Sequence, residues 1–114
     1  MIMRKQELKQ ETMNNLRGGQ GSVEFLHYDS KENMKHCRLL GQISIPKGSG
    51  IGEHVHDDET EYFIITEGEG IVVDNGEETT VNSGDVVKTG DGASHSIRNE
   101  KDTPLRMVAV IITY

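Results

Sequence analysis

Residues 54–68 read HVHDDETEYFIITEG, and this stretch decides how the rest of the chain is interpreted. Successive side chains of a β-strand point to opposite faces, so His54 and His56 project from the same face. The acidic segment 57–60 is expected to reverse the chain, and Glu61 then opens a run of aromatic and β-branched residues. Imidazole nitrogens and a carboxylate oxygen suit transition metals, so the stretch is a candidate metal site.

An isolated pair of histidines is more often solvated than ligating, and the glycines around this pair are what favour a site. The spaced positions are Gly48, His54, His56, Glu61 and Gly68, with five, one, four and six residues between them. This spacing resembles the first sequence motif of the cupin family at every fixed position.

A second stretch resembles the other cupin motif. Its spaced positions are Gly84, Gly90, Gly92, His95 and Asn99, with five, one, two and three residues between them. The one departure is Gly90, where proline is usual, and it raises the question of how firmly the loop before His95 is held. A gap of 15 residues separates the two stretches, which is similar to the gap in small single-domain cupins.

The resemblance implies an all-β fold, a double-stranded β-helix or jelly-roll barrel with a metal in its pocket. The implied ligands are His54, His56, Glu61 and His95. The implied metal is a divalent Mn, Fe, Zn, Ni or Cu ion, whose identity the sequence leaves open.

The function implied by the resemblance is broad, because a fold does not fix a reaction. Cupins with such ligands include dioxygenases, oxalate-degrading enzymes, isomerases, lyases and proteins that bind without turnover. We expect a site that acts on a small organic molecule by oxygenase or lyase chemistry. A non-catalytic sensor of a metabolite or metal, and a metal that only ties strands together, are the alternatives.

The remaining pattern favours many short strands, as in a sandwich or barrel. Strands are expected at residues 22–28, 37–45, 62–66, 71–81 with a hairpin turn at 74–76, 86–89, 94–98 and 105–114. We expect an N-terminal arm, residues 1–21, and a single barrel domain, residues 22–114. The apolar residues in the first part of the arm show no regular spacing, so this part is either a short strand or largely disordered.

Strand parity predicts which side chains share a face. The inward set comprises Leu39, Gly41, Ile43 and Ile45, then His54, His56, Glu61, Phe63 and Ile65, and finally His95, Ile97 and Asn99. His27 and His36 match neither motif, and we expect both at the surface.

Composition bears on partners and location. The chain has 114 residues and a net charge of −7, which disfavours nucleic acid and anionic membranes as partners. Cys37 is the only cysteine, and no apolar run approaches a membrane span, so we expect a cytoplasmic protein. With two phenylalanines, three tyrosines and no tryptophan, a small-molecule ligand is expected rather than a long sugar polymer.

Two of the expected strands are apolar on their outward faces as well. The outward residues are Tyr62, Ile64, Val108, Val110 and Ile112. A strand that is apolar on both faces is usually buried on both. We therefore expect a homodimer in which these faces pack together. The alternative is that the N-terminal segment of the same chain covers them.

Overall fold

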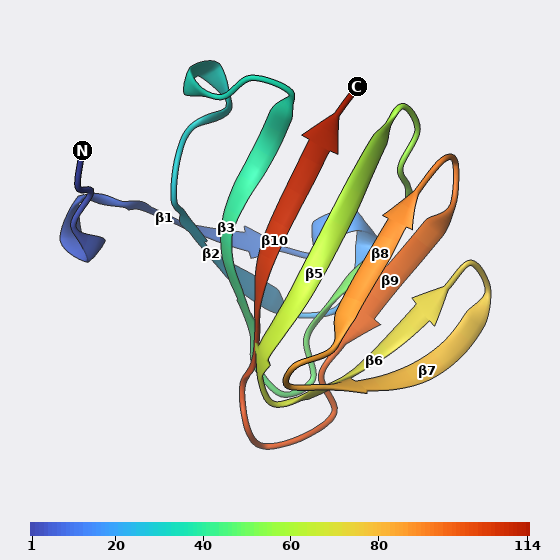
Figure 1. Cartoon of the computed structure of the whole chain (residues 1–114). Helices are drawn as coiled ribbons and strands as arrows, with labels where there is room; N and C mark the ends of the chain where they lie inside the picture. The colour runs from blue at the N-terminus through green and yellow to red at the C-terminus, as the bar shows by residue number, and fades with distance from the viewer.

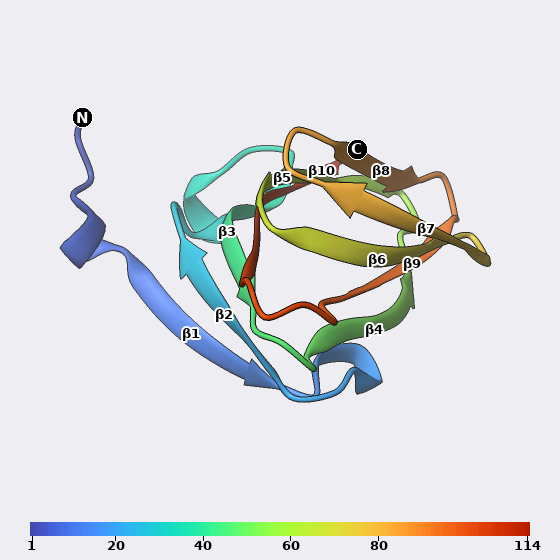
Figure 2. The same ribbon diagram turned by 90° about the horizontal axis from the view of Figure 1, so that it is seen from below.

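The computed structural model describes all residues, 1–114, and consists of two antiparallel sheets that face each other (Figure 1). The larger sheet has the order β1 (Lys9–Asn14), β2 (Ser22–His27), β3 (Cys37–Ile45), β10 (Leu105–Thr113), β5 (Glu59–Glu67) and β8 (Val86–Gly90). The smaller sheet has the order β4 (Gly50–Val55), β9 (Ser94–Arg98), β6 (Glu69–Asp74) and β7 (Glu77–Asn82). Seen from below, the sheets curve around a common interior, as the expected jelly-roll barrel requires (Figure 2).

Local signals in the sequence account for most of these elements. The turn between β6 and β7 places Asn75 at φ 49° and Gly76 at φ 89°, the left-handed geometry that a tight hairpin turn demands. Three short 3₁₀ turns, η1 (Lys5–Glu7), η2 (Leu16–Gly18) and η3 (Lys31–Asn33), are the only helical segments. None of them is long or apolar enough to cross a membrane.

The structure differs from expectation at two places. The glycine-rich sequence of residues 46–52 favours a loop, but strand β4 begins at Gly50 because it pairs with β9 from that residue onward. The N-terminal arm contains β1, which pairs with β2 over six residues, so the short-strand alternative is the correct one.

The core fills one end of the barrel and leaves the other end to polar groups. At one end, Ile45 and Leu105 are cross-strand partners with no exposed surface. Toward the opposite end, Ile111 on β10 is the partner of Glu61 on β5. The expected inward parity of β3 and β5 is confirmed, since Ile43, Phe63 and Ile65 are each 1% exposed. The interior is therefore apolar at one end and includes the polar Glu61 toward the other.

Close packing of glycines fastens the N-terminal segment against β4. A Cβ atom added to Gly19 would lie 2.3 Å from the carbonyl oxygen of Gly50. A Cβ atom added to Gly52 would lie 2.1 Å from the carbonyl oxygen of Arg17. Only residues without side chains allow this approach, and it holds η2 firmly beside the strand that carries His54.

Candidate metal centre

Four side chains from both sheets converge in the barrel interior. His54 lies on β4, His56 directly follows that strand, and His95 lies on β9 as the cross-strand partner of His54. Glu61 comes from β5 in the facing sheet. One ligand atom from each of the four residues lies within 4.8 Å of the others. The structure thus brings together all four residues that the two motifs indicate.

The converging atoms are the Nε2 atoms of the histidines and one carboxylate oxygen. Nε2 of His95 is 3.0 Å from Nε2 of His56 and 3.0 Å from Nε2 of His54. Oε1 of Glu61 is 2.9 Å from Nε2 of His56 and from Nε2 of His95, and 3.7 Å from Nε2 of His54. A single point between the sheets is therefore within reach of three nitrogens and one oxygen.

The opposite ring nitrogens are all engaged by other groups. The Nδ1–H of His54 donates to the carbonyl oxygen of Gly52 at 2.7 Å, and the Nδ1–H of His56 donates to Oε2 of Glu59 at 2.6 Å. Nδ1 of His95 is hydrogen-bonded to the hydroxyl of Thr89 at 2.8 Å. A carbonyl and an ionised carboxylate only accept hydrogen bonds, so neutral His54 and His56 present bare lone pairs at Nε2.

This donor set fits a divalent metal ion. Two nitrogen lone pairs and an anionic oxygen that meet at about 3 Å repel one another unless a cation lies between them. Outer hydrogen bonds that fix the imidazole tautomer are the usual companions of ligating histidines. A mixed set of three nitrogens and one oxygen suits several first-row metals, and a metal held here would supply Lewis-acid or redox chemistry.

Protons compete with a metal ion for these same ligand atoms. Burial raises the pKa of Glu61, but hydrogen bonds from the three histidines lower it more, so the pKa lies far below its usual range. Burial lowers the pKa of His95, which favours the neutral, ligating form. Burial also lowers the pKa of His56, but its hydrogen bonds to Glu61 and Glu59 outweigh this, and the net pKa is raised. The site holds one permanent negative charge.

An outer ion pair orients His56, and sequence reasoning missed it. Glu59 was expected to belong to a solvated turn, but its side chain is largely buried and bonds to His56. Arg38 clamps the same carboxylate with Nε and Nη2, each at 2.7 Å. The hydrogen bond from Arg38 is the main reason that the pKa of Glu59 falls to about 2. Parity was the available signal, because residues 59 and 61 share a face of β5.

Replacing Glu59 with glutamine is expected to weaken metal binding by about 10- to 100-fold, the usual cost of losing an outer partner. It should also change the acid sensitivity of the metal-free protein. A carboxylate with a lowered folded-state pKa stabilises the fold above its ordinary pKa of 4.5, and that contribution disappears as the pH falls toward 2. Urea unfolding should show that the free energy of unfolding falls less between pH 6 and pH 3 in Glu59→Gln than in the parent protein.

The matched control is Asp58→Asn, which neutralises an exposed neighbouring carboxylate outside the site. It should leave both the metal affinity and the difference between pH 6 and pH 3 unchanged. An equal change in the two variants would mean that general charge, and not the contact with His56, is responsible.

The tertiary structure explains the glycine at position 90. Gly90 pairs with Thr60, and a Cβ atom at position 90 would lie 2.5 Å from Oγ1 of Thr60. Thr60 is buried, and its hydroxyl is hydrogen-bonded to the phenol of Tyr114, so it has little freedom to move aside. A proline ring would clash with Thr60 in the same way, whereas glycine has no side chain to clash.

A cavity of about 450 Å³ is lined by three of the four converging side chains, His54, His56 and Glu61. Its walls include Phe25, Ile43 and Phe63 from the core, and its rim includes charged groups from the N-terminal half of the chain. The ring of Phe63 stacks on the ring of His95 with 4.8 Å between centroids and 7° between planes. A ligand in this cavity has direct access to the candidate metal position.

A jelly-roll barrel that gathers three histidines and a glutamate between its sheets defines a class of metal-site proteins. The chain belongs to the cupin family, because the sequence profile of the cupin domain matches residues 41–111. The expected family and the expected fold are both confirmed.

The relatives are consistent with this assignment. A protein of Thermotoga maritima named oxalate-binding protein is 43% identical over 113 residues, which cover 98% of this chain and 93% of the relative. A crystal structure from Thermotoga maritima, described as a predicted oxalate decarboxylase, matches the whole of both chains with a TM-score of 0.94 and 43% identity. A sugar phosphate isomerase of Silicibacter pomeroyi matches with a TM-score of 0.78 over 100% of this chain and 76% of its own, at 16% identity, which indicates the fold alone.

Proposed function

We propose that the chain binds a divalent transition metal through His54, His56, Glu61 and His95 and uses it to hold a small chelating carboxylate, of which oxalate is the simplest. The observation that carries the proposal is the convergence of three Nε2 atoms and one carboxylate oxygen beside an accessible cavity. The name of the Thermotoga maritima relative, oxalate-binding protein, supports this ligand class.

Charge and coordination number favour such a ligand. A divalent cation and the ionised Glu61 leave a net charge of about +1 at the centre, which attracts an anion. Four protein ligands leave up to about two positions of an octahedral metal open. Two adjacent oxygens of one ligand fill two such positions.

The test is ligand-dependent stabilisation of metal-loaded protein. Protein loaded with Mn²⁺, and in parallel with Zn²⁺, should unfold at a higher temperature when oxalate is added, because a ligand that binds only the folded state stabilises it by about 2.7 kcal/mol at 100 times its Kd. Acetate, which lacks the second carboxylate, serves as the control and should shift unfolding much less. The same shift with oxalate in chelator-treated protein would contradict the proposal.

A catalytic role is the second candidate. It takes support from the description of the solved Thermotoga maritima structure as a predicted oxalate decarboxylase and from the open side of the candidate centre. The reaction would then be of the oxygenase or lyase type on the same class of acid. Product formation that stops with chelator and returns with one metal selects this candidate, whereas stabilisation without product selects binding alone.

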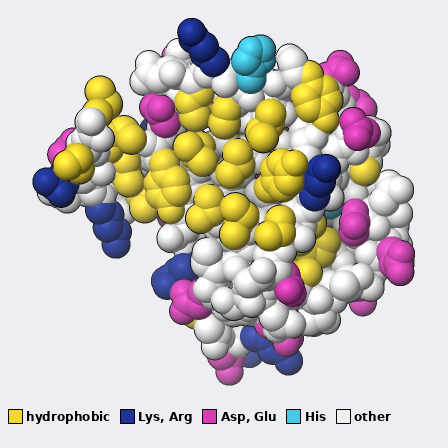
Figure 3. Space-filling model, in the orientation of Figure 1, with side chains coloured by type: hydrophobic (Ala, Val, Ile, Leu, Met, Phe, Trp, Pro, Cys, Tyr) yellow, Lys and Arg dark blue, Asp and Glu magenta, His cyan; other side chains and the backbone are white.

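We also propose that the chain forms a homodimer through the outer face of the larger sheet. Apolar side chains cover this face over β3, β10 and β5 (Figure 3). Ile64 is 39% exposed and Ile112 is 42% exposed, although both lie in the middle strands of the sheet. The N-terminal end leads away beyond β1 and does not cover the middle strands, which argues against the alternative cover (Figure 1). Exposed apolar patches of this kind commonly mark interfaces.

The dimer is tested by Ile64→Lys, which places a charge within the apolar face, on the interior strand β5. The parent protein should elute with twice the mass of the 12.7 kDa chain, and the variant should elute as a monomer in light-scattering chromatography. Thr79→Lys adds the same charge to exposed β7 and should leave the mass unchanged. A monomeric parent protein would refute the proposal.

Three further expectations remain predictions. The net charge of −7 and the single free cysteine, Cys37, favour a cytoplasmic protein without nucleic-acid or membrane partners. The division into an arm, residues 1–21, and a barrel, residues 22–114, is tested by removing the arm and measuring whether the remainder still unfolds cooperatively.

A further inference from the structure

The cavity beside the metal centre is longer than oxalate requires. Glu61 and His27 both line it, although their strands β5 and β2 are separated by β3 and β10 in the larger sheet. Three strand spacings correspond to about 14 Å along the sheet, and a two-carbon acid spans only part of that. A ligand that fills this space extends well beyond its chelating end.

The row of residues between the two ends is small in its middle. His27 is the cross-strand partner of Gly41, Gly41 of Ala109, and Ala109 of Phe63. Neither Gly41 nor Ala109 lines the cavity, so this row contributes no side chain to it between the ring of Phe63 and the ring of His27. Larger apolar side chains line the cavity, namely Phe25, Leu39, Ile43 and Ile111. The middle of the cavity is therefore suited to an apolar body.

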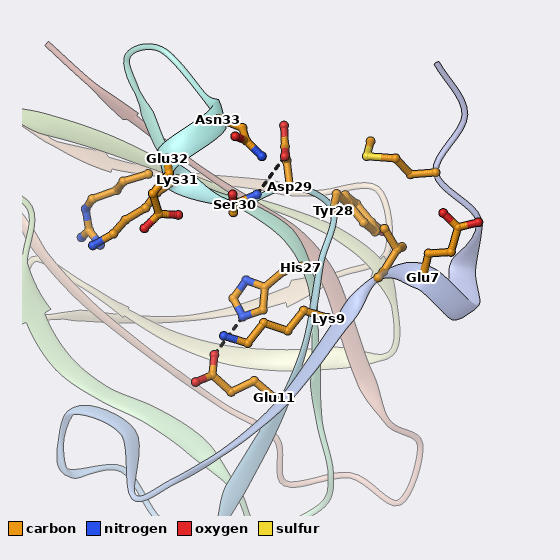
Figure 4. Close-up of a pocket in the computed structure, with 13 residues that line it drawn as sticks. Glu7, Lys9, Glu11, His27, Tyr28, Asp29, Ser30, Lys31, Glu32 and Asn33 are labelled. Atoms are coloured by element: carbon orange, nitrogen blue, oxygen red, sulfur yellow. Dashed lines mark hydrogen bonds and ion pairs between the residues drawn. The ribbon is translucent and has the colours of Figure 1, made fainter.

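A second, polar hollow of about 430 Å³ lies beside the far end of the cavity. The residues that line both hollows are Glu11, His27, Lys31 and Arg38. Figure 4 shows His27 on β2 with Glu11 reaching it from β1, and Lys31 on the segment above them. The two hollows adjoin at these four shared wall residues, and the pair of hollows is called the cleft below.

His27 is held for contact with a ligand at this junction. The expectation that it is a surface residue is wrong, because its side chain is only 22% exposed. Its ring stacks on Phe25 with 5.5 Å between centroids, and its Nε2–H donates to Oε1 of Glu11 at 2.9 Å. Nδ1 makes no hydrogen bond within the chain and is free to accept one from a ligand hydroxyl.

We propose that the preferred ligand of the cleft is an elongated 2-oxo acid, with its chelating head at the metal centre, an apolar body against Phe25, Ile43 and Ile111, and a hydroxyl tail bonded to His27. This inference rests on the proposed function, since the head needs the metal. We assign the hydroxyl tail to His27 because its hydrogen bond to Glu11 fixes the imidazole ring and its side chain lines the cavity. Unpaired cations on the rim, Arg17 and Lys31, favour entry of an anion.

The experiment compares four acids by calorimetry on protein loaded with Mn²⁺, and in parallel with Zn²⁺: oxalate, pyruvate, 2-oxohexanoate and 6-hydroxy-2-oxohexanoate. Affinity should rise about fourfold for each added methylene that is buried, or about 60-fold from pyruvate to 2-oxohexanoate. The hydroxyl should add roughly fivefold more through one hydrogen bond. In His27→Phe, which keeps a ring to stack on Phe25, the affinity ratio of the two longest acids should fall to about one.

The control is His36→Phe, since His36 is an exposed histidine that lines neither hollow. It should preserve the whole affinity series. Equal affinities for pyruvate and 2-oxohexanoate would overturn the inference. An affinity ratio of the two longest acids that stays unchanged in His27→Phe would also overturn it. In either case, binding of oxalate would leave the proposed function standing. Failure of all four acids to bind metal-loaded protein would overturn both.

Discussion

Replacing His56 with alanine is expected to abolish stoichiometric binding of a divalent transition metal while the barrel stays folded. His56 contributes one of the four converging ligand atoms, because its Nε2 lies 2.9 Å from Oε1 of Glu61 and 3.0 Å from Nε2 of His95. The loss should exceed the 10- to 100-fold effect that is typical of an outer partner. Elemental analysis of the purified parent and variant proteins measures it directly.

The fold should survive because its base is held by strand pairing and by apolar burial away from the centre. Circular dichroism of metal-free His56→Ala should match that of the metal-free parent. His36→Ala removes an exposed histidine and should retain full metal content. Unfolding of the variant would instead assign the metal a structural role, and equal metal content in parent and variant would exclude His56 as a ligand.

Replacing Phe63 with alanine is expected to produce the largest loss of stability, about 3–5 kcal/mol in the free energy of unfolding. Phe63 is 1% exposed and lies in the middle of β5, where it belongs to the central apolar cluster. The variant leaves a cavity that the close-packed interior cannot fully close. Urea unfolding of the metal-free protein separates this effect from any contribution of the metal.

The same substitution should also weaken metal binding, because the Phe63 ring stacks on His95 and limits its rotation. Phe63→Leu restores much of the volume without the flat ring, so it should recover most of the stability but less of the metal affinity. Val55→Ala truncates a side chain that is 53% exposed and should cost no more than about 0.5 kcal/mol. Similar losses at positions 55 and 63 would contradict the assignment of the core.

Much of the candidate site was predictable because local rules govern it. Strand parity alone places His54 and His56 on one face, and the same rule places Phe63 and Ile65 beside Glu61 on the inward face of β5. The spacing of glycines then joins the two motifs, since tight turns return each strand to the interior at a fixed distance along the chain. The predicted inward set agrees with the observed burial for this reason.

Residues that act through contacts distant in sequence were not predictable. Arg38 and Glu59 lie 21 positions apart, and no local pattern pairs them. His27 carries no motif, and its position in the cleft depends on the pairing of β1 with β2 and of β2 with β3. The polar character of each residue suits an exposed turn or strand end equally well.

The sequence by itself determined the class of fold and the four residues that converge, because its two spaced motifs resemble those of the cupin family and strand alternation places His54 and His56 on one face. The tertiary structure alone decided the ion pair between Arg38 and Glu59 beside His56, the need for glycine at position 90 and the cavity that is lined by both Glu61 and His27. These features depend on which strands become neighbours when the two sheets close. That choice minimises the free energy of the whole barrel, and no short segment encodes it.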